Sequence, residues 1–175
     1  SVLMDVGRGE EARTETLKTL AVAERTQDPR LLAQIHQALQ ALAVWRGPSA
    51  AALEHGARAL AYAQEAQDAR SAWQAEWMLA LHAGLTGDSA GTALHLAEAE
   101  RLAEELRSPI LRLWTAEVAI EYRSGIGEWD AALTIAAETI ESARAFGQRL
   151  LLPRVLVWSG LIHCGRGELE TAKKY

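Results

Sequence analysis

The stretch "RSGIGEWDAAL" at residues 123–133 has the pattern of a helix end, a glycine turn and the start of the next helix. Gly127 is the residue expected to end the first helix, because glycine adopts the left-handed backbone conformation without a Cβ penalty. Glycine also occupies positions 7, 47, 87 and 167, which form one evenly spaced series with position 127. The series predicts a helical unit that repeats at the same interval, from one of these glycines to the next.

Composition limits the class of protein. Of the 175 residues, 49% are hydrophobic and 23% are charged, which is typical of a globular chain and excludes wholesale disorder. The net charge of −5 argues against direct contact with nucleic acid. The single cysteine, Cys164, excludes an internal disulfide and a cysteine-rich zinc site, and it favours a reducing, cytoplasmic location. The most apolar stretch, "LLLPRVLVW" at 150–158, is too short to span a membrane and contains a proline and an arginine.

Helix-forming residues, alanine above all, dominate the whole chain, and the alternating patterns of strands are absent. Asp28 with Pro29, and Ser108 with Pro109, are typical helix starts, because the first residue caps the helix and proline is tolerated in its first turn. We therefore expect helices at about 10–27, 30–46, 49–67, 70–86, 89–106, 110–124, 129–146, 150–165 and from 168 onward.

These helices group into units of two, which we place at about 8–47, 48–87, 88–127 and 128–167, with a partial unit at 168–175. The first helix of each unit opens with alanine, at Ala12, Ala52, Ala93 and Ala132, and the third unit needs a shift of one residue. One pair of helices cannot bury both of its faces, but stacked pairs can. The prediction is an all-α, right-handed solenoid of antiparallel helix pairs in a single domain over 1–175; a closed bundle is the alternative.

The first and last residues resemble incomplete units. "SVLMDVG" matches the last turn of a second helix, and "ELETAKKY" matches the opening of a further unit. We therefore expect the chain to be a fragment of a longer array. Apolar faces at cut ends offer a route to self-association.

The segment "GEWDAA" at 127–132 has an aromatic residue two places after the glycine and an alanine three places further on. This pattern resembles the turn and second helix of the tetratricopeptide repeat (TPR), and "GDSAGTAL" and "GELETA" are weaker copies. The spacing of the glycine series exceeds the TPR value of about 34 residues. Longer TPR-like helices of this composition are similar to the sensor region of MalT-type, LuxR-class bacterial transcription activators. In that family an ATPase module precedes the repeats and a DNA-binding helix-turn-helix follows them, and neither is in this sequence.

The resemblance implies a TPR-like regulatory or sensor segment that binds a protein segment or a small-molecule effector. It also implies a groove lined by one face of each glycine-terminated helix. Projection of that face gives Gln34, Gln37 and Ala41 in the first unit, Gln74, Trp77 and Leu81 in the second, Trp114, Glu117 and Glu121 in the third, and Arg154, Val157 and Leu161 in the fourth. Trp114 would then lie beside two carboxylates, which favour a partner carrying Lys, Arg or sugar hydroxyls. Packing between units is the alternative role for the tryptophans.

No catalytic constellation is evident, and we expect neither a cofactor nor a metal. Glu117 and Glu121 lie on one helix, whereas a glycosidase usually brings its acid and base from different segments. The five histidines show no ligand spacing, and "GLTGDSAGT" at 84–92 lacks the lysine of a phosphate loop. A free-standing TPR adaptor is the alternative function. The projected groove contains only one basic residue, Arg154, so a clamp for a C-terminal carboxylate is disfavoured.

Overall fold

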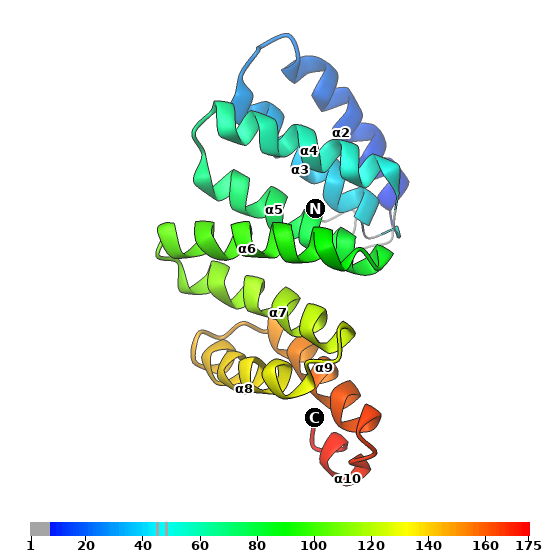
Figure 1. Cartoon of the computed structure of the whole chain (residues 1–175). Helices are drawn as coiled ribbons and strands as arrows, with labels where there is room; N and C mark the ends of the chain where they lie inside the picture. The colour runs from blue at the N-terminus through cyan, green and yellow to red at the C-terminus, as the bar shows by residue number, and fades with distance from the viewer. Residues whose placement is uncertain (1–7, 45, 48) are drawn as a thin grey trace. The chain divides into compact units, whose positions relative to one another are not determined.

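A computed structural model of the chain describes residues 8–175 except 45 and 48. In this part of the chain all regular structure is helical and no strand occurs, which confirms the predicted all-α class. The helices are α2 (Gly9–Ala23), α3 (Pro29–Val44), α4 (Ala50–Glu65), α5 (Ala69–Thr86), α6 (Ser89–Glu105), α7 (Pro109–Gly125), α8 (Trp129–Ala145), α9 (Leu151–Gly165) and α10 (Leu169–Ala172) (Figure 1). None of these described helices has the length and apolar character needed to cross a bilayer. The prediction for Gly7 lies outside the described residues.

The turns that join successive helices share one backbone conformation, which recurs at a constant interval. Positive φ angles occur at Gly47, Gly87, Gly127 and Gly167, and midway between them at Gln27, Gln67, Arg107 and Gly147. At Gly127, φ is +84°, and the following backbone N–H, of Glu128, donates to the carbonyl of Arg123 at 2.8 Å. This is the Schellman motif that ends a helix. The glycine series therefore ends every second helix, as predicted, for the four glycines that the structure describes.

Side-chain caps begin the helices where the sequence predicts them. The Asp28 carboxylate accepts from the backbone N–H of Arg30 at 3.0 Å, and Asp68 and Asp88 cap α5 and α6 in the same way. The Ser108 hydroxyl accepts from the N–H of Leu111 at 3.4 Å, at the start of α7. Each such cap stabilises its helix by about 1 kcal/mol.

The structure corrects the predicted one-residue shift in the third unit. The buried residues near the start of α2, α4, α6 and α8 are Ala12, Ala52, Thr92 and Ala132, which are evenly spaced along the chain. Ala93 is only half-buried. Thr92 fits this position because its hydroxyl donates to the carbonyl of Asp88 at 2.8 Å, so the small side chain leaves no unsatisfied polar atom.

The helices form two compact units, the first of which contains the residues up to Leu102. Within it, α3 packs on α2, α4 packs on α3, α5 packs on α4, and α3 also packs on α5. The core contains Leu32, Ile35 and Leu39 in one cluster, and Met78 with Leu81 in another. α3, α4 and α5 approach closely at Gly56, where an added Cβ would lie 2.4 Å from the Gln40 side chain and 2.6 Å from the Leu79 side chain.

The second compact unit begins at Ala103 and contains α7 to α10. α8 packs on α7 and α9, α7 also packs on α9, and α10 packs on α9. Its core centres on Ile120, Leu151 and Val155, each with no exposed surface. Burial of each such side chain contributes about 2 kcal/mol. Trp129 packs against this core, and its indole N–H donates to the carbonyl of Ser124 at 3.1 Å, so it secures the turn before α8.

Candidate functional site

In the first compact unit, some of the predicted groove residues are exposed and others are buried. Gln34 on α3 and Gln74 on α5 are exposed. Trp77 is half-buried and stacks on Trp73, with the ring centroids 5.9 Å apart. It also packs against the core cluster around Met78, so packing accounts for much of its surface.

Gln37 and Leu81 do not line an open groove, contrary to prediction. The Gln37 side chain is 5% exposed, and its Nε2 donates to the carbonyl of Ser71 at 2.7 Å, which ties α3 to α5. Leu81 is 4% exposed and packs with Val44 and Met78. The projected face was wrong at these positions because α3 and α5 pack directly on each other and cover part of it.

The second compact unit brings three of the predicted groove residues together. Glu117 and Glu121 lie one turn apart on α7, and Arg154 comes from α9, which packs on α7. We call these three residues the carboxylate cluster. Trp114, one turn before Glu117, is half-buried against the core of this unit. Val157, one turn after Arg154, is 60% exposed.

Glu117 was predicted to face a groove, but its side chain is fully buried. Arg154 stabilises the buried carboxylate, because its Nε and Nη2 donate to Glu117 Oε1 at 3.0 and 2.8 Å. The second carboxylate oxygen, Oε2, is buried and has no hydrogen-bond partner among the described residues. A buried carboxylate oxygen without a partner is costly, since it loses its hydration and gains nothing in return.

The electrostatics of the cluster follow from burial and charge. Burial raises the pKa of the Glu117 carboxyl, and the positive charge and hydrogen bonds of Arg154 oppose that rise. Burial also raises the pKa of Glu121, and the nearby charge of Glu117 raises it further, while Arg154 again lowers it. With both carboxyl groups ionised, two negative charges share one guanidinium. The cluster therefore favours the uptake of one positive charge, as a proton or as part of a ligand.

The repeat itself provides an internal comparison for this cluster. The residues at the equivalent positions of the other units are Gln37, Trp77 and Val157 for Glu117, Ala41, Leu81 and Leu161 for Glu121, and Gln34, Gln74 and Trp114 for Arg154. None of these residues is charged. Packing of the helix pairs therefore does not require charge at these positions, and two carboxyl groups with one arginine are a local departure from the repeat.

Apolar surface lies along α9 beyond Arg154. Val157 is 60% exposed and Leu161 is 54% exposed, and the two follow Arg154 at the i+3 and i+7 positions of the same helix. Side chains at this spacing lie on one helix face. The face of α9 that carries Arg154 thus combines a charged end with exposed aliphatic side chains.

Sequence reasoning missed the pairs that cross between helices. His36 Nδ1 lies 3.1 Å from His55 Nδ1, and His95 Nδ1 lies 2.7 Å from Glu76 Oε2. Both pairs are 19 residues apart, nearly one helix and one turn, and this spacing was the signal that could have revealed them. Among the described residues, no group of three or more His, Cys, Asp or Glu side chains is placed to hold a metal ion.

The described residues form helices whose turns recur at a constant interval, and the second compact unit buries the Glu117 carboxylate against the partly exposed Arg154. Comparisons with protein-family models, with curated proteins and with solved structures found no match to this chain.

Proposed function

We propose that this chain is a non-catalytic binding module built as a right-handed, TPR-like solenoid. We further propose that it is the regulatory or sensor segment of a bacterial transcription regulator and acts in the cytoplasm. The evenly recurring turn and the matching even spacing of Ala12, Ala52, Thr92 and Ala132 support the repeat. The resemblance of "GEWDAA" to the TPR turn supports the family.

The carboxylate cluster is the observation that supports a binding role. Glu117 Oε2 is buried without a partner, Glu121 makes no hydrogen bond to any described residue, and both carboxyl groups share Arg154. A cationic group that approaches Glu121 would relieve this excess of negative charge. The exposed Val157 and Leu161 add an apolar contact next to it. The proposed partner is therefore a protein segment that carries a lysine flanked by aliphatic side chains.

A short peptide tests this role. Acetyl-Leu-Lys-Leu-amide should bind in isothermal titration calorimetry, and the same peptide with acetylated lysine should bind at least about tenfold more weakly, because it lacks the charge. Glu121→Gln should weaken the lysine peptide by a similar factor. Glu138→Gln is the matched control, since Glu138 is an exposed glutamate on α8. Equal binding of both peptides, or equal effects of both variants, would contradict the proposal.

The regulatory assignment has a separate test in the reading frame that encodes the chain. An ATPase module before these repeats and a helix-turn-helix after them would support a transcription regulator. A frame that contains neither would favour the free-standing adaptor. Turnover of any substrate that Glu117→Gln abolishes, with the helix content unchanged, would show that the chain is an enzyme instead.

A further inference from the structure

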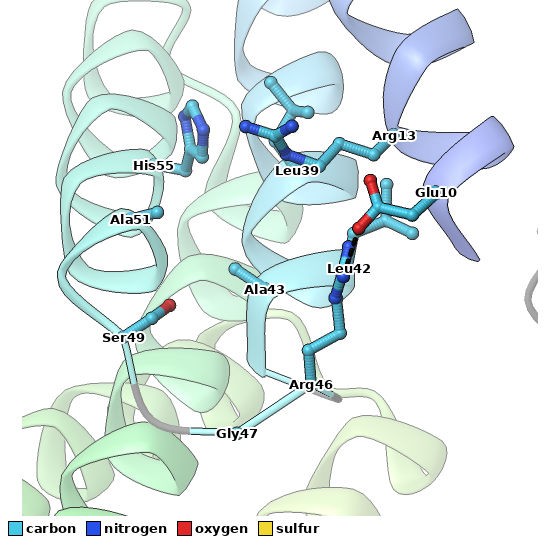
Figure 2. Close-up of a pocket in the computed structure, with 10 residues that line it drawn as sticks. All are labelled: Glu10, Arg13, Leu39, Leu42, Ala43, Arg46, Gly47, Ser49, Ala51 and His55. Carbon is cyan, nitrogen blue, oxygen red and sulfur yellow. Dashed lines mark ion pairs between the residues drawn. The ribbon is translucent and has the colours of Figure 1, made fainter.

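The first compact unit contains a pocket between α2, α3 and α4, with a volume of about 320 Å³ (Figure 2). This volume is at the lower end of the range of small-molecule sites, about 300–1,000 Å³. The pocket shares no residue with the carboxylate cluster, which belongs to the second unit.

Two arginines and one glutamate give the pocket a positive charge. Arg46, just beyond the end of α3, forms an ion pair with Glu10 on α2. Arg13, also on α2, extends its guanidinium toward the side of the pocket that carries His55 (Figure 2). Arg13 forms no ion pair with any residue that the structure describes. The three charged side chains therefore sum to one positive charge, in a chain whose net charge is −5.

His55 leaves this balance unchanged at neutral pH. Burial lowers the pKa of its imidazole, and the positive charges of Arg58 and Arg13 lower it further against the opposing effect of Glu54. Its Nδ1 faces His36 Nδ1 at 3.1 Å, on the side of α3. His55 is thus a neutral polar wall of the pocket, and the two arginines carry its positive charge.

The other walls are apolar and come mainly from Leu39, Leu42 and Ala43 on α3. The repeat again shows which side chains packing does not require. In the next unit, the positions equivalent to Glu10, Arg13 and Arg46 hold Ala50, Leu53 and Thr86. None of these three is charged. In the fourth unit, however, Asp130 and Arg166 stand at the positions of Glu10 and Arg46 and form the same ion pair at 2.6 Å, whereas Leu133 stands at the position of Arg13. Arg13 is therefore the charge that packing of the repeat does not require.

We propose that this pocket binds a small organic anion with one carboxylate and a short aliphatic tail. The carboxylate would lie between Arg13 and Arg46, where guanidinium groups give charge-assisted, bidentate hydrogen bonds. The tail would lie against Leu39 and Leu42, where it is removed from water. This site goes beyond the proposed function and does not depend on it.

Hexanoate is the probe, with hexan-1-ol and hexylamine as partners of equal chain length and acetate as the anion without a tail. Hexanoate should bind the full chain at least about tenfold more tightly than hexan-1-ol, because only hexanoate pairs with the arginines. Acetate should bind more weakly than hexanoate by at least about tenfold, because it lacks the buried methylenes. Hexylamine should show no saturable binding. Titration calorimetry or NMR chemical shifts report each affinity.

Three variants separate charge from shape. Arg13→Gln and Arg46→Gln should each weaken hexanoate by about tenfold, and Glu10→Gln should strengthen it several-fold, because it removes a competing carboxylate. Arg25→Gln is the matched control, since Arg25 is an exposed arginine that does not line the pocket. Circular dichroism confirms that each variant is folded. Equal affinity for hexanoate and hexan-1-ol, or a Glu10→Gln variant that binds hexanoate no better than the parent chain, would overturn the proposal.

Discussion

Replacement of Arg154 by leucine tests the structural logic of the carboxylate cluster most directly. Arg154 donates two hydrogen bonds to Glu117 Oε1, and Glu117 has no exposed surface. Leucine keeps an apolar side chain of useful volume on α9 but removes the positive charge. The Glu117 carboxylate would then be buried without a counter-ion, which is among the most costly changes that one substitution can make.

Two estimates of the cost agree. Removal of one partner from a buried ion pair typically costs about 3–5 kcal/mol, and the 31% exposure of the Arg154 side chain places this pair near the lower end. Glu117 can also escape by taking up a proton. From its ordinary pKa of 4.5, this costs about 3.4 kcal/mol at pH 7 and only about 0.7 kcal/mol at pH 5. Arg154→Leu should therefore lower the free energy of unfolding by about 3 kcal/mol at pH 7 and by clearly less at pH 5.

Urea unfolding followed by circular dichroism at 222 nm measures this free energy at both pH values. The double variant Glu117→Val with Arg154→Leu should recover most of the loss, because the equivalent position of the next unit is Val157. Arg149→Leu, at an exposed arginine, is the control and should change stability by less than about 0.5 kcal/mol. If Arg154→Leu costs no more than Arg149→Leu at pH 7, or if the double variant is as unstable as the single one, the reasoning fails.

Three further predictions concern stability. Burial, with the charges of neighbouring basic groups, lowers the pKa of His36 from 6.5 to about 4, so the stability that it confers is present above pH 6.5 and is lost as the pH falls toward 4. Between pH 7 and pH 5 the parent chain should lose about 2 kcal/mol of unfolding free energy through His36. His36→Leu should abolish this part of the loss, measured by urea titration at each pH. Trp77→Ala should lower the free energy of unfolding by about 2 kcal/mol, because the ring packs on the core. An unchanged melting temperature would contradict this packing role. Gly127→Ala should cost about 1 kcal/mol, since φ there is +84°, whereas Gly125→Ala within α7 should be neutral or stabilising in the same thermal melts.

The accuracy of the sequence predictions depended on how local each feature is. The helix starts were predicted to within one residue, because capping by Asp28 or Ser108 and the left-handed turn at Gly127 are decided by a few neighbouring residues. The third unit was misread by one residue because Ala93 was taken as the marker. Thr92 fills the same small, buried position, since its hydroxyl is satisfied within its own helix.

The candidate site, in contrast, depends on residues that are far apart in the sequence. The spacing of Trp114, Glu117 and Glu121 placed these residues on one face of one helix, as i, i+3 and i+7 positions must be. That spacing does not indicate which residues of other helices contact this face. Arg154 lies 37 residues from Glu117, and only the packing of α9 on α7 brings its guanidinium to Oε1.

The sequence by itself determined the helices, their turns and the period of the glycine series, because hydrogen bonds within a helix and its caps involve residues that are close along the chain. Only the tertiary structure decided which polar residues of a helix are exposed and which are buried. Gln34 and Gln37 lie on the same helix, less than one turn apart, yet one is exposed and the other bonds to α5. That difference is set by the neighbouring helix, whose contacts come from residues far away in the sequence.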